Sequence, residues 1–137
     1  MTFPNIGVLA IQGDVREHAS HLERSGANVV LVKREEEFSN LQGLVIPGGE
    51  STTMSILAVK NRLLEPLRTF AQTRPVYGSC AGLIMLADRI EDGRTDQQTI
   101  GGLHITARRN AFGRQVDSFE ISLDIPVLGH EPFPAVF

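Results

Sequence analysis

The chain has 137 residues, of which 42% are hydrophobic and 21% charged, as expected for one globular domain spanning residues 1–137. The net charge is −3 and there is no basic block, which disfavours nucleic-acid binding through a broad electrostatic footprint. No apolar run approaches membrane-spanning length, the N-terminus lacks the pattern of a signal peptide, and the single cysteine, Cys80, excludes an internal disulfide. We therefore expect a cytoplasmic protein that binds neither nucleic acid nor membrane.

The first two thirds of the chain alternate short apolar strands with helices. Strands are expected at Ile6–Ile11, Val29–Val32, Leu44–Ile46 and Pro75–Gly78, and helices from Asp14 to about Ser25, from a cap at Ser51 or Thr52, from Leu63 to Thr73 and from Ala81 to Ala87. Continuous apolar runs are typical of strands that are buried on both faces of a parallel sheet. The alternation therefore predicts an α/β fold with a mostly parallel sheet and flanking helices.

The last third of the chain has a different pattern. Residues 91–98 form a polar loop, and strand-like stretches follow at Leu103–Ala107 and Ser118–Leu123, on either side of the turn-rich segment 110–113. We expect these strands to be antiparallel and to lie at one side of the main sheet. The final segment, PFPAVF, indicates the start of a further strand.

The segment Gly78–Gly82 (GSCAG) places the cysteine between a predicted strand and a predicted helix. A nucleophile flanked by small residues in such a turn is typical of a nucleophile elbow, in which glycines tolerate the strained backbone. Cys80 would lie at a helix N-terminus, which favours thiolate over thiol, and the N–H of Ala81 could stabilise an oxyanion. An inert, buried Cys80 is the alternative, and the motif alone does not choose among amidases, hydrolases and redox sensors.

A second turn, Pro47–Thr53 (PGGESTT), follows the third predicted strand. Its two glycines, Gly48 and Gly49, leave backbone N–H groups that can point at a ligand, and one of them could complete an oxyanion hole opposite Ala81. Glu50 could accept hydrogen bonds from a ligand amine or amide. The simpler interpretation is a strand–helix turn with capping hydroxyls. The neighbouring cysteine turn favours a site built from two loops.

The acidic cluster Glu35–Glu37 is most simply a solvated group of charges.

At these two turns the chain resembles class I, triad-type glutamine amidotransferases, and most closely the family of glutaminase subunits of pyridoxal 5′-phosphate synthase. The resemblance is carried by GVLAIQGDVREH (7–18), GLVIPGGESTTM (43–54), GSCAGLIMLA (78–87), RRNAFGRQVDSFE (108–120) and PFPAVF (132–137). The stretches QGDVREH and RNAFGRQVDSFE are specific to this subfamily, whereas the two turns are shared more widely. The resemblance implies a flavodoxin-like fold of the class I type, incomplete at the C-terminus.

The resemblance also implies a reaction. Cys80 attacks the amide carbon of L-glutamine, releases ammonia and leaves a thioester that water cleaves. It assigns the oxyanion hole to Gly49 and Ala81, and the binding of glutamine to Gly48, Gly49, Glu50 and Arg109. The ammonia passes to a synthase subunit in a hetero-oligomeric complex that makes pyridoxal 5′-phosphate (vitamin B6), and the turn at residues 12–18 faces that partner. No cofactor and no metal are implied.

Two departures from the family pattern stand out. Ser79 replaces the usual threonine, which is a conservative change. The family's downstream His-Pro-Glu segment, with the catalytic base, and its Ile-Arg pair have no counterpart, so the chain is expected to be a C-terminally truncated form of doubtful activity. None of the four histidines, His18, His21, His104 and His130, has the spacing or local pattern of that base.

Three other functions are compatible with parts of this pattern. A catalytically silent module could bind the synthase without making ammonia. A glutaminase could feed another acceptor, as in imidazole glycerol phosphate synthase, although RNAFGRQVDSFE argues against it. A redox sensor or general hydrolase could use the same scaffold, but neither needs the glycine turn and Arg109 as an amino-acid clamp.

Overall fold

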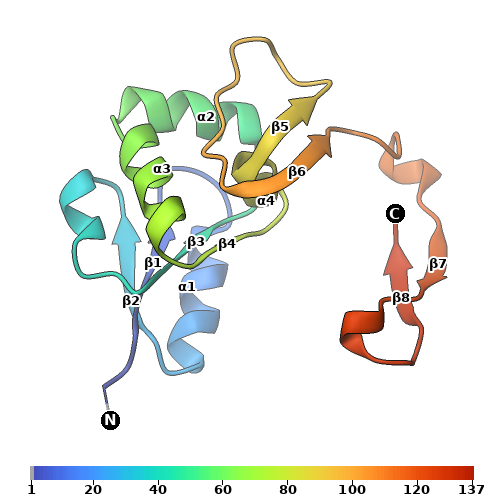
Figure 1. The fold of residues 1–137 in the computed structure, drawn as a ribbon, viewed down its shortest axis with the longest axis horizontal. Helices are drawn as coiled ribbons and strands as arrows, with labels where there is room; N and C mark the ends of the chain where they lie inside the picture. The colour runs from blue at the N-terminus through green and yellow to red at the C-terminus, as the bar shows by residue number, and fades with distance from the viewer. Residues whose placement is uncertain (1) are drawn as a thin grey trace.

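The structure, a computed structural model, describes residues 2–137. A four-stranded sheet forms its centre, in the order β2-β1-β3-β4 with all neighbours parallel (Figure 1). The strands are β1 (Asn5–Leu9), β2 (Asn28–Val32), β3 (Gly43–Ile46) and β4 (Val76–Gly78). This order matches the first four strands of the flavodoxin-like arrangement, so the predicted α/β fold is confirmed.

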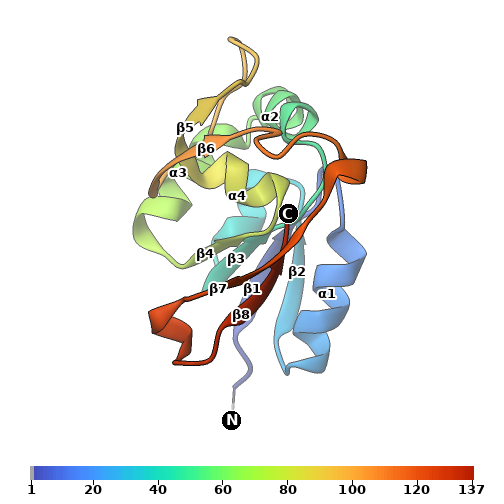
Figure 2. The ribbon, with the colours of Figure 1, turned by 90° about the vertical axis from the view of Figure 1, so that its right-hand side faces the viewer.

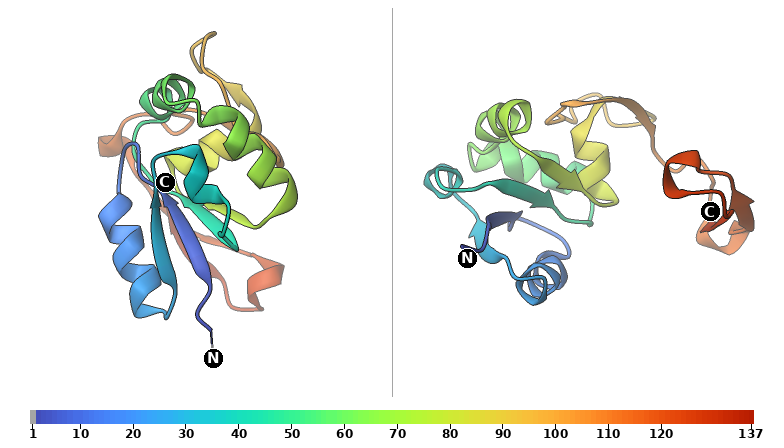
Figure 3. Two further views of the ribbon diagram at one scale, coloured as in Figure 1. Left: turned by 90° about the vertical axis from the view of Figure 1, so that its left-hand side faces the viewer. Right: turned by 60° about the horizontal axis from the view of Figure 1, so that its bottom comes forward.

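Helices cover both faces of the sheet. They are α1 (Val15–Arg24), α2 (Ser51–Lys60), α3 (Leu64–Thr73) and α4 (Ala81–Leu86), with a 3₁₀-helix, η1, at Glu35–Phe38. Helices α2, α3 and α4 lie on one face and α1 on the other (Figure 3). The main core fills the space between the sheet and α2–α4; its side chains, at most 1% exposed, include Leu9, Ile46, Met54, Leu67 and Met85. Because α1 has only half-buried apolar residues, this core fixes the position of the carboxyl ends of β3 and β4.

Two local expectations are wrong in detail. The N-cap of α2 is Glu50 rather than Ser51 or Thr52, because the longer Glu50 carboxylate accepts hydrogen bonds from two backbone N–H groups of the first turn. The acidic cluster is also more than a solvated group of charges. It forms η1, and Glu37 accepts hydrogen bonds from the backbone N–H groups of residues 33 and 34 at 2.6 and 2.9 Å.

The segment after α4 contains a strand that the sequence did not predict. Strand β5 (Ala87–Glu91) pairs with β6 (Leu103–Arg108) in parallel, so the expectation that the latter segment is antiparallel is wrong. The connecting loop explains the direction. Its Gly101 and Gly102 have φ of 74° and 98°, and the N–H of Ile100 bonds back to the carbonyl of Met85 at 2.8 Å. The chain therefore returns to the start of β5 before β6 begins.

The last part of the chain forms a hairpin that stands away from the body of the molecule (Figures 1 and 3). Strands β7 (Glu120–Leu123) and β8 (Phe133–Val136) are antiparallel, which confirms the strand expected in PFPAVF. The expected antiparallel arrangement of 103–107 and 118–123 is wrong, because β6 pairs with β5 and β7 pairs with β8. The rings of Phe112, Phe119 and Phe137 pack together at the base of the hairpin, with centroids 4.6 to 5.9 Å apart. Within residues 2–137, no helix is long and apolar enough to cross a membrane.

Candidate active site

The cysteine lies in a strained turn between β4 and α4. Cys80 has φ 51° and ψ −111°, a conformation that a non-glycine residue rarely adopts, and its side chain is exposed. Both flanking glycines are required by close packing. A Cβ on Gly82 would lie 2.1 Å from the carbonyl oxygen of Ile46, and a Cβ on Gly78 would lie 2.5 Å from the backbone of Gly82. The turn therefore has the tight, exposed geometry expected of a nucleophile elbow.

Two backbone N–H groups are available beside this cysteine. Ala81 is the first residue of α4, so its N–H has no partner within the helix, and Gly49 has φ 152°. Neither N–H donates to another backbone group among residues 2–137. Gly48, in the glycine turn, packs between the cysteine turn and Asp14, because a Cβ there would lie 3.5 Å from Cys80 Cβ and 2.9 Å from Asp14 Oδ2. The two turns predicted from sequence are thus in contact.

A cavity of about 300 Å³ opens in front of the cysteine. It is lined by Gly49, Glu50, Ser51, Cys80, Ala81, Ile84, Arg108, Arg109 and Asn110. Every residue that the resemblance assigned to the site lies in this lining except Gly48, which is buried behind it. The contributing elements are the N-termini of α2 and α4 and the C-terminal end of β6 (Figure 2).

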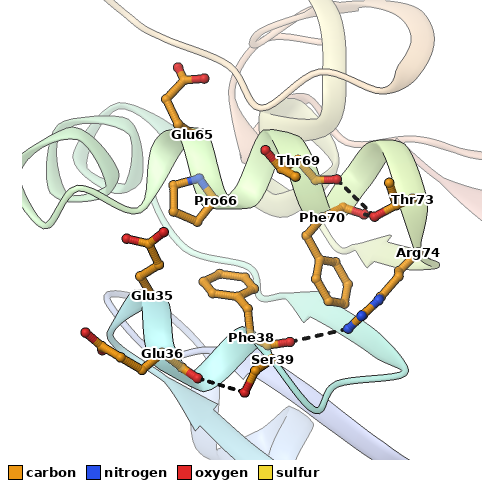
Figure 4. Close-up of a pocket in the computed structure, with 10 residues that line it drawn as sticks. All are labelled: Glu35, Glu36, Phe38, Ser39, Glu65, Pro66, Thr69, Phe70, Thr73 and Arg74. Carbon is orange, nitrogen blue, oxygen red and sulfur yellow. Dashed lines mark hydrogen bonds between the residues drawn. The ribbon is translucent and has the colours of Figure 1, made fainter.

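A larger cavity of about 420 Å³ lies between η1 and α3, away from the cysteine (Figure 4). Its floor is made by the rings of Phe38 and Phe70, whose centroids are 5.7 Å apart. Arg74 closes one end and donates to the carbonyl oxygens of Leu41 at 2.6 Å and Phe38 at 3.4 Å. None of the predicted site residues lines it, so size alone does not identify the functional cavity.

Glu50 is held as an anion at the mouth of the cysteine cavity. Its two oxygens accept hydrogen bonds from the N–H of Thr53 at 2.6 Å, the N–H of Thr52 at 3.0 Å, the hydroxyl of Thr53 at 2.8 Å and Arg109 Nη2 at 3.3 Å. The bonds from Thr53 and Thr52, chiefly the one from the Thr53 N–H, lower the pKa of Glu50 from 4.5 to about 2. A ligand amine that approached Glu50 would share oxygens that the first turn of α2 already uses.

Arg109 reaches across the cavity from the end of β6 to the start of α2. Its side chain is 21% exposed, and besides Glu50 it contacts the hydroxyl of Thr52 and the side-chain oxygen of Gln97, at 3.0 and 3.2 Å from Nη1. Three protein contacts therefore fix the guanidinium in place. Such a planar cation is suited to a carboxylate ligand.

The sequence did not reveal which side chains link the turns. Gln12, in the turn after β1, accepts a hydrogen bond from the N–H of Glu50 at 3.1 Å, and the N–H of Asp14 donates to the carbonyl of Gly48 at 3.0 Å. Asp14 precedes α1 as predicted, but its side chain makes no capping bond there within the described residues. Gln12 belongs to the stretch QGDVREH, which gave a signal for it, whereas nothing in the sequence pointed to Gln97.

None of the four histidines lines the cysteine cavity. His18 and His21 lie on α1, and His21 contacts Arg24. His104, on β6, pairs with Asp88 at 3.0 Å and so links β6 to β5, while His130 is exposed in the β7–β8 connection. In the described part of the chain, no histidine is therefore placed to act as a base for Cys80.

A parallel α/β sheet that brings a strained cysteine turn against a glycine turn, with a fixed arginine opposite, is the architecture of a cysteine-dependent glutamine amidotransferase. Residues 8–137 match the model of the SNO glutamine amidotransferase family, and the chain belongs to that family.

Individual relatives agree with this assignment. The chain is 56% identical over 137 residues to the pyridoxal 5′-phosphate synthase subunit PdxT of Kineococcus radiotolerans, covering 98% of this chain and 66% of the relative. It is likewise 56% identical to the PdxT subunit of a Nocardioides species, covering 99% and 68%. A solved structure described as a glutamine amidotransferase superimposes with a TM-score of 0.79 at 42% identity, over 96% of this chain and 69% of that chain. The chain thus spans about two thirds of the length of the relatives it matches, and the family resemblance is confirmed.

Proposed function

We propose that this chain is the glutaminase component of a pyridoxal 5′-phosphate synthase, releasing ammonia from L-glutamine through a thioester on Cys80. The observation that carries the proposal is the single cavity that joins Cys80, the N–H groups of Gly49 and Ala81, and the guanidinium of Arg109. The names of the relatives support the synthase as the acceptor of the ammonia.

The proposed chemistry uses each of these groups once. The Cys80 thiolate attacks the amide carbon, and the oxygen that becomes negative accepts hydrogen bonds from the N–H groups of Gly49 and Ala81. As the intermediate collapses, water supplies a proton to the leaving nitrogen, the C–N bond breaks, and ammonia and a thioester are formed. Water then adds to the thioester and frees glutamate and the thiol. Arg109 holds the α-carboxylate of glutamine, so that the amide carbon lies next to the sulfur.

Water attack on the thioester needs a base, and none of the four histidines lines the cavity. This observation supports a second candidate function, a catalytically silent module that binds the synthase without making ammonia. Loss of one member of a catalytic unit costs on the order of 10⁴ to 10⁶ in turnover, so the two functions are readily separated.

The test is ammonia release from glutamine by the 137-residue chain with the synthase subunit added, and with Cys80→Ala as the control. Release that depends on Cys80 supports the glutaminase. No release, combined with co-purification of the two subunits and saturable labelling of Cys80 by a glutamine-analogue electrophile, supports the binding module. Absence of both release and saturable labelling would refute the proposed site.

A further inference from the structure

We propose that Gln97 is a positioning residue, which orients the Arg109 guanidinium so that one donor edge faces the Cys80 cavity. Gln97 lies in the loop between β5 and β6, outside every motif of the sequence analysis. The inference rests on the proposed function, because it takes Arg109 as the group that binds the α-carboxylate of glutamine.

The hydrogen-bond donors of Arg109 can be accounted for one by one. A guanidinium has five N–H groups, one on Nε and two on each terminal nitrogen. Nη1 donates to Gln97 Oε1 at 3.2 Å and to Thr52 Oγ1 at 3.0 Å, which uses both of its N–H groups. Nη2 donates once, to Glu50 Oε1 at 3.3 Å.

The remaining donors form the binding edge. Among residues 2–137, Arg109 Nε has no hydrogen-bond acceptor, and Nη2 has one N–H left over. The Nε–H and an Nη2–H lie parallel on one edge of the planar group, which matches the two oxygens of a carboxylate. By holding Nη1, Gln97 and Thr52 determine which edge of the guanidinium is left for the ligand.

The two residues that follow Gln97 are attached to the main core. The first, Gln98, donates its backbone N–H to the buried hydroxyl of Ser55 on α2 at 2.8 Å. Arg68 on α3 donates to the carbonyl of Thr99 at 2.9 and 3.1 Å. The loop is therefore attached to two helices of the main core, and Oε1 of Gln97 has little freedom to leave Arg109.

The other end of the Gln97 side chain argues against a packing role. Gln97 Nε2 is buried and has no hydrogen-bond partner in the described part of the chain. Burying an amide nitrogen without an acceptor is unfavourable, and an apolar side chain of the same length would avoid that loss. The amide is therefore explained by its oxygen, which accepts hydrogen bonds from Arg109 Nη1 at 3.2 Å and from the hydroxyl of Thr52 at 3.4 Å.

The experiment measures labelling of Cys80 by 6-diazo-5-oxo-L-norleucine, an electrophilic glutamine analogue, in the full 137-residue chain. Gln97→Met keeps the length of the side chain and removes the acceptor. We expect the half-saturating concentration of the analogue to rise about 10-fold, with the limiting rate unchanged, because a hydrogen bond to a charged group is lost. Gln97→Glu, which keeps an acceptor oxygen, should restore most of the affinity. Gln72→Met, at an exposed position on α3, is the matched control and should label like the unsubstituted chain.

Iodoacetamide, which has no α-carboxylate, should label Cys80 equally in all these variants. If Gln97→Met labels with an unchanged half-saturating concentration, the inference is overturned while the proposed function stands. If the unsubstituted chain itself shows no saturable labelling, both are overturned. If circular dichroism shows that Gln97→Met is unfolded, Thr52→Val serves instead, because it removes the other acceptor of Arg109 Nη1. An unchanged half-saturating concentration in Thr52→Val would then overturn the inference.

Discussion

The cysteine turn depends on a close approach of α4 to β3 that a single methyl group should prevent. In Gly82→Ala the new Cβ would lie 2.1 Å from the carbonyl oxygen of Ile46 and 2.8 Å from its carbonyl carbon. These atoms belong to the backbone of a fully buried strand, so they cannot rotate away. Relief requires α4 and β3 to separate by roughly 1 Å, and such overpacking costs about 1–3 kcal/mol.

The higher helix propensity of alanine offsets part of the cost of this clash. Alanine is a better helix former than glycine by about 1 kcal/mol. Because the clash is with backbone, we place its cost at the upper end of the range, and we expect Gly82→Ala to lower the free energy of unfolding by about 2 kcal/mol. With a typical dependence on denaturant, the urea midpoint should fall by about 1 M.

The matched control is Gly43→Ala, at the start of the same buried strand β3. There a new Cβ would meet only Ile6 Cδ1, the end of a flexible side chain, at 3.3 Å and the carbonyl of Pro75 at 3.5 Å. Its midpoint should stay within about 0.5 M of the unsubstituted chain. Equal midpoints for Gly82→Ala and Gly43→Ala would refute the argument that the elbow depends on this contact.

Two further substitutions test hydrogen bonds that hold loops against the core, one beside the η1–α3 cavity and one beside the site. Arg74→Met removes the donor to the carbonyl of Leu41 and should cost about 1–3 kcal/mol in urea unfolding, whereas Arg16→Met, at an exposed position on α1, should be nearly neutral. Ser55→Ala removes the acceptor for the Gln98 N–H and should lower the free energy of unfolding by about 1 kcal/mol. It should also weaken labelling of Cys80 by the glutamine analogue. Unchanged labelling would show that the position of the loop does not affect the site.

Much of the main sheet could be predicted because its signals are local. Each of the four predicted strands is short, apolar and followed by a turn, and each recurs in the structure within a few residues of its expected bounds. The cysteine turn was equally local, since the two glycines around the cysteine permit the close backbone contacts that a strand-to-helix turn needs. In both cases the residues that determine the structure are neighbours in sequence.

Strand β5 shows where this approach fails. Its residues Asp88 and Arg89 are exposed, and the eleven-residue connection to β6 has no apolar periodicity. The parallel pairing depends on contacts made after the chain returns, such as the bond between the N–H of Gly102 and Asp88 at 3.0 Å. A strand is recognised in a sequence by its pattern of buried apolar residues, and this strand pair is too exposed to show such a pattern.

The side-chain links of the site are invisible for a related reason. Gln12 and Glu50 are 38 residues apart, and Thr52 and Arg109 are 57 apart, so only the folded sheet brings them together. The cap of α2 illustrates the consequence. Local preference favours serine or threonine at the N-cap. Glu50 takes that position instead, because it also makes hydrogen bonds with Arg109 and Gln12, which are distant in sequence.

Because Glu50 joins the cap of α2 to Arg109, acid should affect the helix and the site together. A carboxylate whose pKa is lowered from 4.5 to about 2 stabilises the fold fully above pH 4.5, and this contribution disappears as the pH falls toward 2. The side chain is 48% exposed, so after allowance for solvent screening we expect about 1 kcal/mol, the size of an ordinary helix cap.

Glu50→Gln tests this link because the amide keeps only one acceptor oxygen and does not titrate. The difference in unfolding free energy between the unsubstituted chain and this variant should be about 1 kcal/mol at pH 7 and should shrink toward zero near pH 2. Urea unfolding at pH 7, 5 and 3 measures it, and Glu36→Gln, on the exposed face of η1, controls for the loss of one negative charge. A difference that stayed constant across this range would mean that Glu50 stabilises α2 by packing, and that its charge does not hold Arg109 in the cavity.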